Sequence, residues 1–451
     1  MALRAISGDA IEPPEQTVLQ RRLRLPDGFN IEVWATGIPN ARFMAVSETG
    51  DLLVSSPRGS QVFLVADRDT GEVAAGRASV LLDGLNRPHG LALHDGWLYI
   101  GEGSGVSRIR FDAARRTTSG ELEKIVKGLP AGGNHWSKTV HVGPDDRLYV
   151  SVGSSCNVCI EEDPRRAGIL RYELDGSGGT QYASGLRNTV DFAWYPRTGL
   201  LYGTDNGRDL LGDDFPPCEL NEIVEGGFYG WPHVNGAGHL DPDFAGQAGA
   251  AKLDSAIDPV HAFPAHSAPL GIAFYDHDAF PSRYRDAAFV ALHGSWNRSR
   301  KQGYAVVAVH FNADGSTVQE PFLSGFVVDE EASGRPVGIA VGANGELFVS
   351  DDYTGSIYRI NYAGIPSSTA FIVSAANPAG EVLWTDNGCA ACHLPGETDA
   401  PPALLTGLKA EYDVDSLQQF LLTPQPPMPL YSFTDDERAK LARYLLARFG
   451  D

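Results

Sequence analysis

The sequence predicts an all-β domain of six repeated units followed by a small all-α domain. Between residues 40 and 362, a short apolar run, a turn rich in Gly, Asp or Asn and a second apolar run recur six times. Further strand-forming runs follow the hairpins, and helical patterns are almost absent before residue 378. Units of up to four strands, repeated roughly every 50 to 80 residues, are typical of a six-bladed β-propeller. An open β-sandwich is the competing architecture.

Each unit begins with a predicted hairpin. Turns such as Gly342–Gly345 combine glycine and asparagine, which suit tight connections between two strands. We place the propeller at residues 25–362, after an N-terminal extension of residues 1–24. The six hairpins are expected at residues 43–56, 90–102, 139–153, 191–205, 271–294 and 338–352.

The C-terminal domain is expected at residues 378–451, after a linker of residues 363–377 that carries few charges. Two thiols three positions apart followed by a histidine, as in Cys389-Ala390-Ala391-Cys392-His393, form the attachment motif of a c-type haem. Cys389 and Cys392 would bind the porphyrin and His393 the iron. Met428, in a proline-rich loop, is the predicted second axial ligand. A disulfide or a chance match is the alternative.

A terminal helix follows this loop. Thr434 and Glu437 have the spacing of a capping box, and the apolar positions Leu441, Tyr444, Leu445 and Phe449 recur at helical spacing. The two features predict a helix over residues 434–449, within an all-α cytochrome c domain.

Composition excludes several classes of partner. The chain has 36 Lys and Arg against 57 Asp and Glu, a formal net charge of −21, which argues against nucleic acid and anionic membranes. No apolar run is long enough to span a bilayer, and no signal peptide is visible. Haem c is attached outside the cytoplasm, so we expect a periplasmic or secreted protein, in which Cys156 and Cys159 favour a disulfide. Cys218 is left over.

Polar residues gather at one edge of the predicted blades. In an antiparallel blade the start of the first strand and the end of the second lie at the same edge. Arginines and histidines recur there, and such a group of cations repels itself unless an anion binds, which predicts a polyanionic ligand. The nearby acidic loop has the oxygen chemistry of a calcium site, although a solvated loop explains it equally well. The acidic loop comprises Asp205–Asp209 and Gly212–Asp214 and leads to Glu219. The positions before the first strands include Arg42, Arg87, His89, Asn134, His135, Arg187, Asn188, His266 and Arg335, and those after the second strands include Ser155–Cys156, Asn206–Arg208, His293–Arg298 and Asp351–Tyr353.

Several of these segments together resemble the soluble pyrroloquinoline quinone (PQQ) sugar dehydrogenases, over about residues 25 to 362. The closer similarity is to the sorbosone dehydrogenase branch. The segments that carry it are Gly133–Ser137, Gly185–Asn188, Glu219–Asn221, Gly226–Pro232 and Gly334–Gly338 for the family, and Ser154–Cys159, His266–Gly271 and Leu292–Arg298 for the branch.

The resemblance implies a six-bladed propeller that binds PQQ and Ca²⁺ at the channel mouth. It makes His135 the catalytic base, with Arg187 and Asn188 as cofactor contacts and Arg335 as the partner of a PQQ carboxylate. Trp296, Arg298 and Arg87 are further predicted cofactor contacts. The carbonyls of Gly207 and Arg208 would hold the calcium at PQQ, and Glu219 and Tyr229 a possible second one.

Two departures leave parts of this assignment open. Asn134 stands where the family often has an aspartate, so the orientation of His135 can differ from that in the family. Cys218 stands where a carboxylate is expected beside Glu219, so the presence of the second calcium is open.

The expected function is that of a quinohaemoprotein. A sugar, aldose or related polyol is oxidised to the lactone or acid, and electrons pass through haem c to an external respiratory acceptor. The alternatives are a calcium-dependent propeller lactonase or hydrolase, and a non-enzymatic docking module that carries a cytochrome.

Overall fold

The chain divides into two compact units, Met1–Ile365 and Pro366–Asp451, at a point inside the predicted linker. The computed structural model describes residues 22–67 and 75–364 of the first unit. The other domain boundaries inferred from sequence remain predictions. In the second unit the model describes residues 380, 383–384, 389, 393, 405, 408, 412–422, 424, 428 and 433–449.

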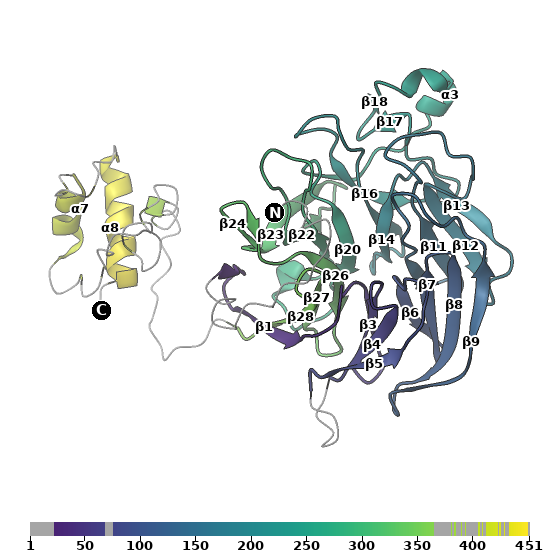
Figure 1. Ribbon diagram of the computed structural model, residues 1–451. Helices are drawn as coiled ribbons and strands as arrows, with labels where there is room; N and C mark the ends of the chain where they lie inside the picture. Colours follow the sequence, from purple (N-terminus) through teal and green to yellow (C-terminus); the bar gives the residue numbers. More distant parts are fainter. Residues whose placement is uncertain are drawn as a thin grey trace. The chain divides into compact units, whose positions relative to one another are not determined.

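The first unit contains six four-stranded antiparallel sheets, which confirms the predicted six-bladed β-propeller (Figure 1). All six predicted hairpins form the first two strands of a blade. Blade 1 contains β2 (Met44–Val46), β3 (Leu52–Ser56), β4 (Gln61–Val65) and β5 (Ala78–Leu82); blade 2 contains β6 (Leu91–His94), β7 (Trp97–Glu102), β8 (Gly105–Asp112) and β9 (Thr117–Lys127); blade 3 contains β10 (Val140–Val142), β11 (Arg147–Val152), β12 (Gly168–Glu173) and β13 (Thr180–Ser184).

The remaining blades depart from simple chain order in two places. Blade 4 takes its outer strand from β19, after an insertion, and blade 6 takes its outer strand from β1 near the start of the chain. Blade 4 contains β14 (Thr189–Trp194), β15 (Leu201–Asp205), β16 (Cys218–Ile223) and β19 (His261–Phe263); blade 5 contains β20 (Pro269–Phe274), β21 (Ala288–Leu292), β22 (Ala305–Phe311) and β23 (Thr317–Leu323); blade 6 contains β26 (Pro336–Val341), β27 (Leu347–Asp351), β28 (Ser356–Tyr362) and β1 (Phe29–Ala35).

Apolar side chains fill the space between every pair of neighbouring blades. Successive residues of a strand point to opposite faces of its sheet, so each inner strand can serve two cores at once. In β3, Leu52 and Val54 pack toward blade 6, while Leu53 packs toward blade 2. This explains why the inner strands read as continuous apolar runs in the sequence, because both faces are covered.

Strand β1 closes the circle of blades. It pairs with β28 in antiparallel register, from Phe29 opposite Tyr362 to Ala35 opposite Ile357. Phe29 is 9% exposed and packs edge-to-face on Phe280 and Phe322 of blade 5 and its hairpin. The closure therefore combines a backbone ladder with an aromatic core.

Short elements complete the first unit. They lie in the insertion of blade 4 and in the loops of blades 5 and 6, and comprise β17 (Val234–Asn235), β18 (His239–Leu240), η1 (Ala245–Gln247), α3 (Ala250–Leu253), η2 (Ser282–Tyr284), β24 (Val327–Val328) and β25 (Glu331–Ala332).

The second unit contains α7 (Val414–Leu422) and α8 (Asp435–Phe449), which pack around a common apolar core. The predicted capping box is confirmed: the Thr434 amide donates to the Glu437 carboxylate at 2.8 Å, and the Glu437 amide donates to Thr434 Oγ1 at 3.3 Å. Leu441 and Leu445 are buried, as the helical pattern indicates. Among the described residues, no helix has the length and apolarity needed to cross a membrane.

Candidate active site

A cavity of about 330 Å³ opens at the edge where the first strands of blades 4 and 5 begin and their second strands end. This is the edge at which the sequence placed the functional residues. Five of the predicted site residues line the cavity, namely His135, Arg187, Asn188, Gly207 and Trp296.

His135, in the loop between β9 and β10, is held through its Nδ1 atom. Nδ1 lies 2.8 Å from Ser154 Oγ and 3.1 Å from the Ser154 carbonyl. The Ser154 hydroxyl donates its own proton to the Cys156 carbonyl at 2.8 Å, so toward the imidazole it acts as an acceptor. The neutral ring therefore carries its proton on Nδ1, and Nε2 keeps a lone pair. Ser154 thus orients the imidazole of His135.

The surroundings keep His135 neutral. Burial, with a further contribution from the positive charge of Arg187, lowers the pKa of His135 from 6.5 to about 3. Gly153, just after β11, packs closely against His135 and Asn188. A Cβ at this position would lie 2.5 Å from His135 Cβ and 2.8 Å from Asn188 Oδ1, so only glycine fits without a shift. A neutral imidazole with an available lone pair has the protonation state of a general base.

Arg187, just before β14, is buried in the wall of the cavity. Its Nε donates to the Asn157 carbonyl at 2.9 Å, and one terminal nitrogen donates to the Asn206 carbonyl at 3.0 Å. The other terminal nitrogen donates to Asn157 Oδ1 and to the Asp209 carboxylate, both at 2.9 Å. Among the described residues, four of the five N–H groups of this guanidinium have acceptors, which leaves one for a ligand.

The prediction of a group of arginines that only an external anion can neutralise is wrong in this form. Arg42 forms an ion pair with Asp352 at 2.8 Å, and Arg187 forms one with Asp209 at 2.9 Å. The sequence contains these aspartates, but which arginine each one pairs with depends on the paths of the loops and could not be predicted from it. The cavity has room for a ligand, and the charge of Arg187 in its wall is compensated by Asp209.

Three other predicted cofactor contacts do not line the cavity. Arg335 donates to the carbonyls of His293 and Gly294. Arg298 forms an ion pair with Asp214 at 3.0 Å. Arg87 stacks on the indole of Trp136, with 3.5 Å between the guanidinium carbon and the ring centroid. Their roles in cofactor binding stay predictions.

Two side-chain oxygens at the cavity are buried without a partner among the described residues. They are Oδ1 of Asn206 and Oδ1 of Asn297, and both residues line the cavity. A buried polar atom without a hydrogen bond costs free energy, on the order of 1–3 kcal/mol. Such atoms at a cavity wall indicate a ligand or ion that completes their bonding.

A second, smaller cavity of about 20 Å³ lies beside the first, and its walls include Asp205 and Glu219. These residues face each other across the β15–β16 ladder. Burial raises the pKa of Asp205 to about 6, and burial together with the charge of Asp205 raises the pKa of Glu219 to about 7. A space of this size holds about one water molecule or ion, and paired carboxylates are suitable calcium ligands.

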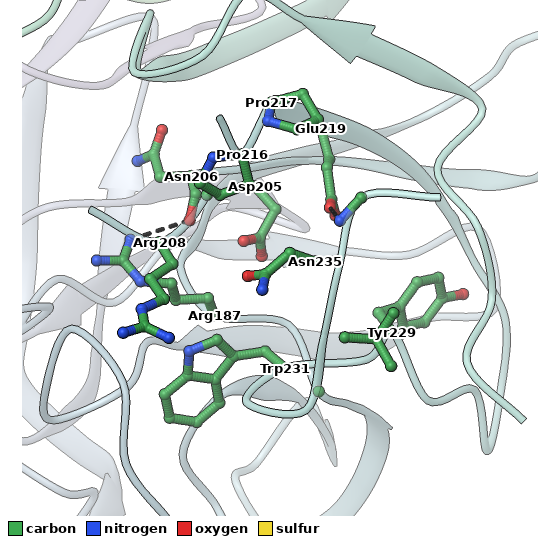
Figure 2. A pocket seen from close by; sticks show the side chains of 14 residues that line it. Arg187, Asp205, Asn206, Arg208, Pro216, Pro217, Glu219, Tyr229, Trp231 and Asn235 are labelled. Atoms are coloured by element: carbon green, nitrogen blue, oxygen red, sulfur yellow. Dashed lines mark hydrogen bonds between the residues drawn. The ribbon is translucent and has the colours of Figure 1, made fainter. Parts of the chain in front are cut away.

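Gly207, Arg208 and Tyr229, the other predicted calcium ligands, also line this small cavity (Figure 2). The carbonyls of Gly207 and Arg208 stay predicted ligands, whereas the side chains of Arg208 and Tyr229 bond elsewhere. Arg208 forms ion pairs with Asp241 and Asp243. The Tyr229 hydroxyl donates to the Glu222 carbonyl at 2.6 Å and so turns away from the carboxylates. The sequence placed Asp205 in an acidic loop but did not pair it with Glu219, because that pairing depends on strand register.

The favoured disulfide between Cys156 and Cys159 is present. Cys218, which forms no disulfide among the described residues, is buried and lines the larger cavity. Sequence reasoning missed Asn157 and Ser154 as functional residues. Both lie in the Ser154–Cys159 segment that carries the resemblance, but their bonds to His135, Arg187 and Asp209 could not be read from the sequence.

The second unit brings some of the predicted haem ligands into its apolar core. Cys389 is buried there, and Met428 packs against the same core. The His393 amide donates to the Cys389 carbonyl at 3.2 Å. Cys392 lies outside the described residues. The haem assignments therefore stay predictions.

Comparison with known proteins supports the propeller assignment. The chain matches the family described as TrAA12-like over residues 23–216 and 247–363. It is 25% identical over 398 residues to a pyrroloquinoline quinone-dependent sugar dehydrogenase of Hypocrea jecorina, a match that covers 74% of this chain and 87% of that protein.

Two solved structures share the fold. The holo form of the pyranose dehydrogenase PQQ domain from Coprinopsis cinerea has a TM-score of 0.64 at 22% identity, covering 77% of this chain and 98% of that one. The calcium structure of a Trichoderma reesei carbohydrate-active enzyme of family AA12 has a TM-score of 0.65 at 23% identity, covering 78% and 99%.

Proposed function

Because the chain belongs to the TrAA12-like family, we propose that its propeller is a PQQ-dependent dehydrogenase that oxidises a sugar, aldose or related polyol to the lactone or acid. The second unit would hold a haem c through Cys389, Cys392, His393 and Met428 and receive the electrons. An external respiratory carrier would take them onward. Haem c attachment places the protein, in this proposal, in the periplasm or outside the cell.

The observation that carries the proposal is the position of His135 in the larger cavity. Its Nε2 lone pair is available, its Nδ1–H is held by Ser154, and Arg187 lies in the same wall. The relatives named above include a PQQ-dependent sugar dehydrogenase and the holo form of a pyranose dehydrogenase PQQ domain.

The residues present fit a polar quinone cofactor. The volume of about 330 Å³ lies within the range of ligand sites. Within the part of the chain that the structure describes, one N–H of Arg187 and the Oδ1 atoms of Asn206 and Asn297 have no hydrogen-bond partner and can bind a polar ligand. Trp296, 61% exposed at the cavity, offers a flat apolar surface for a cofactor or sugar ring.

The chemistry divides between the cofactor and the protein. PQQ, when bound, would supply the carbonyl that accepts a hydride from the substrate carbon. His135 Nε2 takes the proton of the substrate hydroxyl in the same reaction, so the substrate loses one hydride and one proton. Ser154 keeps the imidazole in the required tautomer. The charge of Arg187 favours the negative charge that develops in the cavity.

Calcium is part of the proposal. Gly207 lines both cavities and Arg208 lines the smaller one, where Asp205 and Glu219 are suitable carboxylate ligands. Burial disfavours their charged forms, and the charge of Asp205 adds to this at Glu219, so a cation beside them would offset what keeps their pKa values high. A relative has been solved as a calcium structure, which agrees with this part of the proposal.

The decisive experiment reconstitutes the full-length protein with PQQ and CaCl₂, adds aldoses and lactones, and follows acid release together with the α-band of reduced haem. The proposed dehydrogenase reduces the haem with an aldose. A lactonase releases acid from lactones without reducing haem, and a docking module does neither. His135→Ala should abolish haem reduction by substrate and leave reduction by dithionite intact.

A further inference from the structure

The loop closed by the Cys156–Cys159 disulfide lies directly behind the wall of the larger cavity. Asn157, inside this loop, makes five hydrogen bonds to three other residues. Its carbonyl accepts from Arg187 Nε at 2.9 Å and from Trp231 Nε1 at 3.4 Å. Its Oδ1 accepts from Arg187 at 2.9 Å and from the Asp209 amide at 2.8 Å, and its Nδ2 donates to the Asp209 carbonyl at 3.0 Å.

These bonds connect the loop to the residues that face the ligand space. Asn157 is not among the residues that line the cavity, whereas Arg187 and Asp209 are. Asp209 extends the connection, because its carboxylate accepts from Asn297 Nδ2 at 2.9 Å. Half of the four hydrogen bonds of the Arg187 guanidinium depend on Asn157. Asn157 therefore acts on the cavity through its neighbours.

A second connection starts from the same disulfide. The Cys156 carbonyl accepts the Ser154 hydroxyl proton at 2.8 Å, and this bond makes Ser154 Oγ an acceptor for His135 Nδ1. The position of the Cys156 backbone thus fixes the hydrogen-bond direction at His135. The loop closed by the disulfide is therefore hydrogen-bonded to Arg187 and, through Ser154, to His135.

We propose that Asn157 is a positioning residue for the cavity, and that the Cys156–Cys159 disulfide holds it and the Cys156 carbonyl in the geometry that orders Arg187, Asp209 and His135. The part of this inference that concerns cofactor affinity rests on the proposed function. The part that concerns the order of the 205–209 segment does not.

The disulfide matters because Asn157 uses its backbone and its side chain on the same partner. Both oxygens must face Arg187 at once, which fixes the backbone of Asn157 as well as its rotamer. A covalent link across four residues restricts the loop to few conformations. Reduction by a dithiol, which converts the disulfide to two thiols and oxidises the reagent to its own disulfide, releases this restraint.

The first test measures hydrogen–deuterium exchange of the full-length protein without added PQQ. The informative amide is that of Asp209, because Asn157 Oδ1 is its acceptor. In Asn157→Ala, and in the double variant Cys156→Ser with Cys159→Ser, exchange at Asp209 should accelerate at least about tenfold. Asn157→Asp keeps an oxygen at this position and should retain most of the protection. Ile160→Ala, next to Cys159 and 53% exposed, is the matched control and should exchange like the wild type.

The second test measures PQQ affinity by titration at a temperature well below unfolding. Asn157→Ala should bind PQQ about tenfold more weakly or worse, since the three side-chain hydrogen bonds that position Arg187 and Asp209 are lost. Asn157→Asp should recover part of the affinity, and Ile160→Ala all of it. A residue with only a structural role would lower the melting temperature and leave the affinity of the folded protein unchanged.

The outcomes separate the two proposals. Unchanged exchange at Asp209 in both Asn157→Ala and the double serine variant overturns the positioning role, whatever the activity. If the wild type binds no PQQ, the proposed function fails, and the exchange experiment still decides the role of Asn157. If Asn157→Ala does not fold, the wild type with and without dithiothreitol provides the same comparison, and equal exchange in the two samples overturns the proposal.

Discussion

In the protein without cofactor, the buried neutral His135 should make the free energy of unfolding decrease as the pH falls through the range in which histidines ordinarily titrate. The pKa of His135 is lowered from 6.5 to about 3 in the folded state. In the unfolded chain its pKa is the ordinary value, so at pH 5 the unfolded residue is about 97% protonated while the folded one stays neutral. The unfolded state binds more protons, and stability therefore falls as the pH falls from about 6.5 to about 3.

The size of the effect follows from these two values. Protonation of the unfolded histidine at pH 5 stabilises the unfolded state by about 2 kcal/mol relative to pH 8. His135→Gln removes this contribution, so the wild type should lose about 2 kcal/mol more unfolding free energy than the variant between pH 8 and pH 5. Urea denaturation of both proteins at both pH values measures the difference.

A matched control is His239→Gln, which changes an exposed histidine of β18 and should behave like the wild type at both pH values. Equal pH dependence of unfolding for wild type and His135→Gln would show that His135 is not held neutral by its surroundings. The argument for its readiness as a base would then fail. The same variant, loaded with PQQ, should lose on the order of 10²–10⁴-fold in turnover.

Four further outcomes are expected. Phe29→Ala should destabilise the propeller by about 3–5 kcal/mol in thermal unfolding, because it empties an aromatic core; a loss below about 1 kcal/mol would contradict this. Arg187→Lys should weaken PQQ binding about tenfold or more, since one ammonium cannot replace four directed bonds, and unchanged affinity would count against its role. CaCl₂ should raise the melting temperature of the wild type and not of Glu219→Gln, and an equal rise in both would exclude Glu219 as a ligand. Met428→Leu should retain covalent haem but lose the methionine-to-iron absorption band, and its persistence would assign the axial position to another residue.

The fold could be predicted from the sequence because each blade repeats a local pattern. Both faces of the inner strands are buried between blades, so their apolar runs are long enough to recognise, and glycine-containing turns separate them. The closure by β1 was not predicted. Phe29 and Tyr362 are distant in sequence, and nothing local indicates that they pair.

For the site, the sequence could predict at which edge of the blades it lies and which segments resemble the PQQ sugar dehydrogenases, but no finer detail. Strand direction places His135, Arg187 and Asn188 at one edge, and the structure agrees. The ion-pair partners of the charged side chains could not be predicted, because a contact such as Arg187–Asp209 depends on the path of a loop. The pairing of Asp205 with Glu219 likewise required the strand register.

The pairing of β1 with β28 also constrains how the protein is made. At about 5–20 residues synthesised per second, residue 29 leaves the ribosome roughly 20 to 70 s before residue 362. During that interval β1 has no strand to pair with, and an unpaired strand edge can associate with other chains. Nascent chains of this protein are therefore expected to need a chaperone until the last blade has been translated.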